Sequence, residues 1–115
     1  MTNSRQKGKR GELEVVHLLK EYGFEARRGQ QYSGANGDAD VIGLPGYHIE
    51  VKFREQLNID DALDQSRRDA PPGAIPTVFH RKSRTPWKVT MDAEAFLEII
   101  AALNKFIGGN DGEGR

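Results

Sequence analysis

The segment from Asp40 to Phe53 constrains the fold of this chain more than any other. It holds two short apolar stretches on either side of Pro45-Gly46, a pattern typical of two strands joined by a tight turn. In the second stretch Ile49, Val51 and Phe53 alternate with His48, Glu50 and Lys52. Because burial of each valine or isoleucine contributes roughly 1.5 to 3 kcal/mol, the apolar set faces a core. Glu50 and Lys52 therefore point together to the opposite face.

The length of the loop between these strands decides where Asp40 points. A two-residue loop of Pro45 and Gly46 would pair Asp40 with Val51 and direct it to the apolar face. A three-residue loop that begins at Leu44, with Gly46 in the left-handed conformation, pairs Asp40 with Glu50. We expect the longer loop, or a bend at Asp40 with the same result. Two carboxylates beside Lys52 would bind a hard divalent cation and suit phosphodiester cleavage.

A helix precedes the paired strands and carries a third candidate carboxylate. Its apolar residues recur at helical spacing over residues 11–22, before Gly23: Val15, Leu18, Leu19 and Tyr22. Glu12 lies one turn before Val15 on the same stripe. A carboxylate there is costly unless it is paired or bound to metal. The alternative is that Glu12 is only a favourable first-turn charge against the helix dipole.

The rest of the chain completes an α/β layout. Residues 56–70 predict a loop and a helix, and residues 75–80 and 86–91 predict strands joined by a basic turn. Asp92 is expected to cap a last helix that ends near Ile107, with an apolar face of Phe96, Ile99, Ile100, Leu103 and Ile107. This face is a candidate interface, unless the helix covers the sheet. We expect one domain over residues 1–107 and a disordered tail over 108–115.

Composition limits the class of protein. The chain has 115 residues, 37% of them hydrophobic, and no cysteine, so disulfides and cysteine-based zinc sites are excluded. No apolar stretch is long enough to span a membrane, and no apolar N-terminal segment suggests export. We expect a soluble, cytoplasmic protein of a microbe or its phage.

The formal net charge of +0 does not by itself suggest a nucleic-acid partner. The basic residues are clustered, however, which makes a locally positive face possible. Each cluster could also be ordinary solvated surface. The candidates for DNA binding are Lys7, Lys9, Arg10, Arg27, Arg28, Arg81, Lys82 and Arg84.

The order of these motifs resembles the PD-(D/E)XK nuclease superfamily, and most closely its archaeal-type Holliday junction resolvases. Glu12 in a helix is followed by Asp40-Val41-Ile42 and then by Glu50-Val51-Lys52. Further segments fit the same subgroup from about Lys7 to Met91: Lys7-Gly8-Lys9-Arg10-Gly11-Glu12, Gly23-Phe24, Arg27-Arg28, Ser33-Gly34, Ser66-Arg67-Arg68, Ile75-Pro76-Thr77-Val78 and Trp87-Lys88-Val89. The resemblance implies a restriction-endonuclease-like α/β core, a central mixed β-sheet flanked by helices. It also implies a homodimer that cuts four-way DNA junctions with magnesium, for which manganese substitutes.

The resemblance also implies roles for individual residues. Asp40 and Glu50 would bind the metal, with Glu12 joining directly or through water, while Lys52 would orient the attacking water or stabilise the transition state. Ser33 matches a loop serine that assists cleavage in some resolvases, but it fits a plain turn residue equally well. Ala39 stands where the superfamily name has proline, which makes Asp38 a competing metal ligand.

Several alternatives remain open at this stage. Gln65 could reach the site from its helix, although a surface glutamine is the favoured interpretation. Trp87 could stack on a base, although a core or interface position is favoured. The three histidines, among them His48, lack ligand spacing and are not assigned to metal. The chain could also be a different nuclease of the superfamily, such as a phage nicking or DNA-degrading enzyme, or a DNA-binding module without activity.

Overall fold

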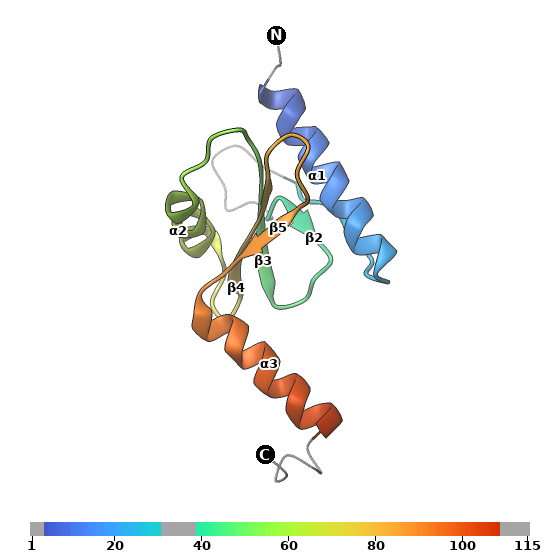
Figure 1. The fold of residues 1–115 in the computed structure, drawn as a ribbon, viewed down its shortest axis with the longest axis vertical. Helices are drawn as coiled ribbons and strands as arrows, with labels where there is room; N and C mark the ends of the chain where they lie inside the picture. The colour runs from blue at the N-terminus through green and yellow to red at the C-terminus, as the bar shows by residue number, and fades with distance from the viewer. Residues whose placement is uncertain (1–3, 31–38, 109–115) are drawn as a thin grey trace.

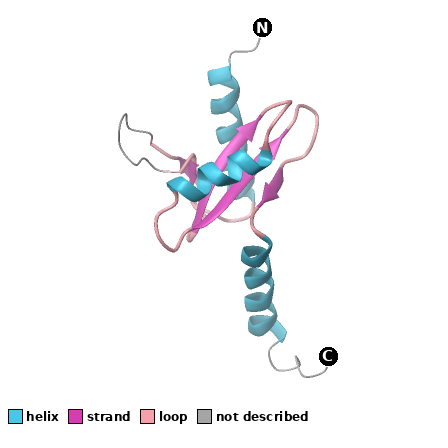
Figure 2. Ribbon diagram, turned by 90° about the vertical axis from the view of Figure 1, so that its left-hand side faces the viewer, coloured by secondary structure: helices cyan, strands magenta, loops and turns pink. Residues whose placement is uncertain are grey.

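A computed structural model describes residues 4–30 and 39–108 of the chain. Within them a five-stranded sheet lies between helix α1 on one face and helix α2 on the other, and helix α3 projects away from this body (Figure 1, Figure 2). The elements in chain order are α1 (Ser4–Glu21), β1 (Arg27–Arg28), β2 (Val41–Ile42), β3 (Tyr47–Phe53), α2 (Ile59–Asp69), β4 (Ile75–Arg81), β5 (Lys88–Thr90) and α3 (Ala93–Gly108).

The sheet has the strand order β1-β2-β3-β4-β5 and is mixed. Strands β3 and β4 are parallel, because α2 crosses over between them, and the other three neighbouring pairs are antiparallel. The expected α/β class, with a central mixed sheet flanked by helices, is therefore confirmed. Strand β1 was not foreseen; its two residues extend the sheet beyond β2.

The turn between β2 and β3 has the longer of the two loops considered. Val41 pairs with Ile49, and the backbone N–H of Asp40 donates to the carbonyl of Ile49 at 2.9 Å. Gly46 has a φ of 89°, which favours glycine. Extending this register by one residue places Asp40 opposite Glu50. The predicted register is thus confirmed.

Helix α1 packs on the face of the sheet that carries the apolar side chains of β3. The buried cluster on this side consists of Val15, Val16, Leu19, Ala26, Val41, Ile49, Val51 and Phe79. The predicted stripe was partly wrong: Val16 is buried instead of Leu18, and Tyr22 is 76% exposed because the helix ends at Glu21.

Helix α1 also begins earlier than the apolar pattern suggested, at Ser4 rather than near Gly11. The apolar pattern starts only where the helix meets the sheet, so the polar first two turns gave no indication that they are helical. At Gly11 the backbone of α1 comes close to β3. A Cβ there would lie 3.0 Å from the Cβ of Phe53, tighter than ordinary van der Waals contact.

Helix α2 covers the other face of the sheet and is held by one buried hydroxyl. The Oγ of Ser66 donates to the carbonyl of His48 at 2.8 Å and accepts from the N–H of Thr77 at 3.2 Å. Ala62 and Leu63 pack there against Val78. These contacts fix α2 over both parallel strands. They also fix which of its side chains lie above the polar face of β3.

Helix α3 leaves the body and none of its residues is buried (Figure 1). It begins after Asp92, as predicted, but the carboxylate of Asp92 pairs with Arg67 at 2.6 Å. Of the two alternatives for this helix, covering of the sheet is not observed. Gly108 is its last residue, and the rest of the expected tail, 109–115, lies outside the described residues. No helix within residues 4–30 and 39–108 is long and apolar enough to cross a membrane.

Candidate active site

Asp40 lies where β2 begins, beside the middle of β3. Its carboxylate Oδ2 accepts a hydrogen bond from the backbone N–H of Val51 at 2.8 Å, and its own N–H bonds to Ile49. These two contacts hold the side chain against β3 at the level of Glu50. The backbone of the hairpin therefore sets the position of this carboxylate.

Glu50 is buried, with only 4% of the residue exposed. Burial and, to a smaller extent, the adjacent carboxylate of Asp40 together raise the pKa of the Glu50 carboxyl to about 8, while Lys52 acts in the opposite direction. Repulsion between the two carboxylates thus contributes to the raised pKa of Glu50, but desolvation is the larger cause.

Glu12 reaches this region from α1 and is paired there. Its Oε1 accepts from the Nη2 of Arg28 at 2.8 Å and from the Nε of Arg28 at 2.9 Å. Burial raises the pKa of Glu12, Arg28 lowers it, and Asp40 raises it again. The alternative of a first-turn charge was wrong, because α1 begins at Ser4 and Glu12 lies in its third turn, where it pairs with Arg28 of β1.

Lys52 lies two residues after Glu50 on the same face of β3. Its Nζ donates to the Oε1 of Gln65 on α2 at 2.9 Å, so the favoured interpretation of Gln65 as a surface side chain was wrong. The reason is the anchoring of α2 by the neighbouring Ser66, which turns Gln65 toward the strand. Lys52 and Gln65 border a polar pocket of about 360 Å³.

The structure adds two residues that the sequence interpretation did not assign. His48 is 5% exposed, and its Nε2 lies 3.2 Å from the Oε2 of Glu50. One ligand atom from each of His48, Glu50 and Asp69 lies within 4.8 Å of the others. Burial lowers the pKa of His48, against the opposite influence of Asp69 and Asp40. The alternation along β3 had placed His48 on the face of Glu50, but nothing in the sequence brought Asp69 to it.

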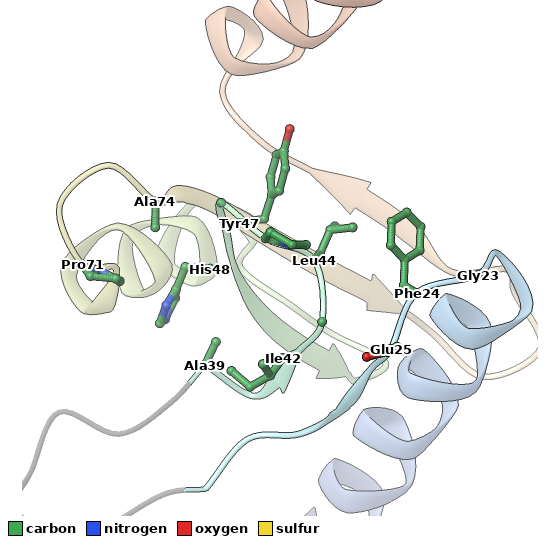
Figure 3. A pocket seen from close by; sticks show the side chains of 13 residues that line it. Gly23, Phe24, Glu25, Ala39, Ile42, Leu44, Tyr47, His48, Pro71 and Ala74 are labelled. Atoms are coloured by element: carbon green, nitrogen blue, oxygen red, sulfur yellow. The ribbon is translucent and has the colours of Figure 1, made fainter.

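His48 also borders a pocket of about 630 Å³. This pocket lies between the β2–β3 turn, the chain after α1 and the segment after α2. Figure 3 shows the imidazole of His48 beside Ala39 and Pro71 at its rim. His48 thus lies at the boundary between the buried polar face of β3 and this pocket.

Two of the candidate residues, Ser33 and Asp38, lie outside the described residues. The described candidates Asp40, Glu50 and Lys52 lie together, and Glu12 is close enough to Asp40 for their charges to interact. Buried, adjacent carboxylates are stable as anions only with a compensating cation. Asp40 and Glu50 therefore fit a hard divalent cation, and Lys52 supplies a nearby fixed positive charge.

The candidate DNA-binding residues fall into two groups. Several already pair with glutamates: Lys7 with Glu55 at 3.0 Å, Arg10 and Arg81 each with Glu14 at 2.9 Å, and Arg28 with Glu12. Arg27 is exposed but donates to the carbonyl of Arg28 at 3.2 Å, and Lys9, Lys82 and Arg84 are exposed as well. Exposed side chains can turn to a phosphate at little cost, so Lys9, Lys82 and Arg84 suit DNA contact best.

Arg81 belongs to an aromatic cluster rather than to open surface. Its guanidinium lies 4.6 Å from the ring centre of Phe53 and 5.7 Å from that of Trp87. The indole of Trp87 donates to Glu14 at 3.1 Å. The favoured interpretation of Trp87 as a core or interface residue agrees with these contacts, which connect β4 and the segment before β5 to α1.

Two basic segments, the start of α1 with Lys7 and Lys9 and the turn after β4 with Lys82 and Arg84, meet at one end of the molecule. Glu55 accepts hydrogen bonds from the Nζ of Lys7 and from the backbone N–H of Ser83, both at 3.0 Å. The start of α1 and the turn between β4 and β5 are thereby joined, as Figure 1 shows at the top of the view. β3 ends at the same place, since Glu55 follows its last residue, Phe53, by two positions.

Known proteins were compared with this chain by sequence and by structure. No family model and no curated protein matches the sequence. Among solved structures the chain is similar to Hjc, a Holliday junction resolvase from the archaeal hyperthermophile Archaeoglobus fulgidus. The two share 25% sequence identity with a TM-score of 0.50, over 74% of this chain and 72% of the other.

The similarity agrees with the order of the sequence motifs, Glu12, then Asp40, then Glu50 and Lys52. The motifs and the mixed sheet indicate the same group of proteins. This chain has a restriction-endonuclease-like α/β fold similar to that of a Holliday junction resolvase of the PD-(D/E)XK type.

Proposed function

We propose that this chain is a magnesium-dependent endodeoxyribonuclease that resolves four-way DNA junctions as a homodimer. The observation that carries the proposal is the register of the β2–β3 hairpin. It sets Asp40 opposite Glu50, with Lys52 on the same face, in a fold similar to that of a junction resolvase. A chain that only bound DNA would have no physical need for these convergent charges.

Asp40 and Glu50 would hold the magnesium ion, or manganese in its place. Glu12 would join directly or through water, with Asp38 as a competing ligand. When bound, the ion lowers the pKa of a coordinated water and offsets charge on the phosphate. Val51 orients Asp40 through its N–H, and burial keeps Glu50 in one position. Both carboxylates are therefore preorganised before substrate arrives.

Lys52 would stabilise the developing charge on the scissile phosphate. Its ammonium has three donors, of which one reaches Gln65. The remaining donors are available to a water or a phosphate oxygen on the side of Glu50. Gln65 acts as a positioning residue that keeps the long lysine side chain extended over the strand. Ser33 would assist from the loop before Asp40.

DNA contact would come mainly from the exposed basic residues at the end of β3. Lys9, Lys82 and Arg84 lie on the two segments that Glu55 joins. These contacts would be to phosphates, so they would position the duplex arms without reading sequence. Junctions would then be recognised by shape.

A gel assay with three substrates tests this function. We expect wild-type protein with Mg²⁺ to cut a four-way junction in paired nicks and to leave flap and linear duplex largely intact. Asp40→Asn should bind the junction with nearly unchanged affinity but cleave it at least about 100-fold more slowly, because a metal ligand charge is lost and little contact area. The matched control Asp60→Asn changes an exposed carboxylate on α2 and should cleave normally.

The outcomes separate the alternatives. Equal cleavage of linear duplex would indicate a different nuclease of the superfamily. Binding without cleavage in Mg²⁺ or Mn²⁺ would indicate an inactive DNA-binding module. Wild-type cleavage by Asp40→Asn would contradict the metal-site assignment.

A further inference from the structure

His48, Glu50 and Asp69 converge on one point beside the proposed magnesium site. One ligand atom of each lies within 4.8 Å of the other two. Within residues 4–30 and 39–108, no other group of three or more such side chains meets this criterion. The set combines one imidazole nitrogen with carboxylate oxygens, so it differs chemically from the all-carboxylate site around Asp40.

The two inner members of the group are fixed by the fold. His48 and Glu50 are successive residues on one face of β3, and their side chains are each 5% exposed. The Nε2 of His48 lies 3.2 Å from the Oε2 of Glu50. Two ligands held about 2.0 to 2.1 Å from a tetrahedral ion lie about 3.3 Å apart. The observed separation thus matches two neighbouring ligands of a single ion.

Asp69 supplies the outer member at the end of α2. It lies one helical turn after Ser66, whose hydroxyl bonds to the carbonyl of His48. The same bond that anchors the helix therefore sets Asp69 over His48. Because Asp69 is exposed and His48 borders the 630 Å³ pocket, an ion could enter from solvent (Figure 3).

We propose that His48, Glu50 and Asp69 form a second metal site that binds a first-row transition-metal ion. Imidazole nitrogen favours zinc, cobalt and similar ions, whereas an all-oxygen set favours magnesium. Glu50 is shared between this site and the proposed magnesium site, so the two ions would be neighbours. The binding of a transition metal here does not depend on nuclease activity.

The alternative is a plain hydrogen bond between His48 and Glu50, with Asp69 nearby by chance. That arrangement would bind no ion with the participation of Asp69. The two interpretations therefore differ in what Asp69 and the imidazole do when a metal is added.

Isothermal titration of untagged, magnesium-free protein with ZnCl₂ tests the site. We expect one tight Zn²⁺ per chain, and at least about 10-fold weaker binding for His48→Gln and for Asp69→Asn. Two matched controls should bind as wild type: His17→Gln, an exposed histidine on α1, and Asp64→Asn, an exposed carboxylate on α2. In parallel, ¹⁵N resonances of the His48 ring should shift on Zn²⁺ addition, and Co²⁺ should give visible ligand-field bands.

The Asp40→Asn variant separates this site from the proposed magnesium site. It should keep its Zn²⁺ affinity within about threefold, because Asp40 is not a member of the group. Undiminished Zn²⁺ binding in either His48→Gln or Asp69→Asn contradicts the second site. Loss of Zn²⁺ binding in Asp40→Asn equal to that in Asp69→Asn also contradicts it. Asp69 is exposed, so its variant tests the proposal even if His48→Gln fails to fold.

Discussion

Glu50 is the residue at which folding and function conflict. It lies buried beside Asp40 and His48, with Lys52 as the nearest cation of its own strand. A buried carboxylate next to another carboxylate opposes folding whenever it is charged. This cost is common at sites that gain their balancing charge from a ligand.

The conflict predicts a pH dependence of stability in metal-free protein. The pKa of Glu50 is about 8 in the folded chain, against an ordinary value of 4.5 for a glutamate carboxyl. Below about 4.5 both states hold the proton, so there is no penalty. Between about 4.5 and 8 the unfolded chain releases it while the folded chain keeps it, so the free energy of unfolding falls as pH rises. Above about 8 the penalty is complete.

Glu50→Gln should therefore be more stable than wild type at pH 8.5 by a few kcal/mol and about equal to it at pH 4. Urea denaturation in EDTA at several pH values measures the difference, in which shared effects of His48 and Asp69 largely cancel. Glu98→Gln, an exposed glutamate of α3, should show no such trend. A constant difference between Glu50→Gln and wild type across this range would contradict the burial argument.

The residues of the site differ in how far sequence could predict them. Glu50 and Lys52 follow from strand alternation, and Asp40 from the turn geometry of Gly46, because both are local properties. Gln65 and Asp69 depend on how α2 sits over β3. That placement rests on the buried hydroxyl of Ser66, which has no sequence signature.

At the scale of elements, the turn between β4 and β5 combines structural and surface arginine and lysine residues. Arg81 is paired with Glu14 and lies over Phe53 and Trp87, whereas Lys82 is exposed. Because both residues are basic and adjacent, the sequence predicts DNA binding for both. Their surroundings instead predict a structural role for Arg81 and a DNA contact for Lys82.

Arg81→Gln should lower the free energy of unfolding by about 1 to 3 kcal/mol, because it removes a charged hydrogen bond and two ring contacts. Lys82→Gln should change it by less than about 0.5 kcal/mol. In DNA binding, Lys82→Gln should weaken affinity for all junction sequences alike and reduce the salt slope by about one. Urea denaturation and fluorescence anisotropy over a range of salt would measure both. Equal stability losses would contradict the distinction.

Helix α1 shows why element boundaries were harder to predict than element types. Its apolar pattern begins only where it reaches the sheet, and the preceding residues Ser4 to Arg10 are largely polar. Val16 faces the core because the helix is rotated so that Gly11 can approach Phe53. The rotation depends on the partner strand and not on the helix sequence.

At the scale of the whole molecule, α3 is the element whose apolar surface the single chain does not use. Its exposed apolar residues are Phe96, Leu97, Ile100, Leu103, Phe106 and Ile107, with exposures from 37% to 87%. Most lie at the spacing of one helical stripe. A contiguous apolar surface of this kind on a projecting helix marks an interaction site. Paired cleavage of a two-fold junction requires two active sites, so the partner we propose is a second copy of the chain, packed through α3.

Leu103→Glu should convert the dimer to a monomer, because it places a charge in the middle of the stripe. Ala101→Glu adds the same charge on the opposite side of the helix, where Ala101 is exposed, and should remain dimeric. Light scattering after size-exclusion chromatography measures the mass of each.

The Leu103→Glu monomer should still fold, since Leu103 is half exposed and not part of the core, but it should nick one strand of a junction where wild type cuts two. A wild-type monomer at assay concentration would contradict the paired mechanism. A Leu103→Glu protein that stays dimeric would move the interface away from α3, and the exposed stripe would then need a different partner.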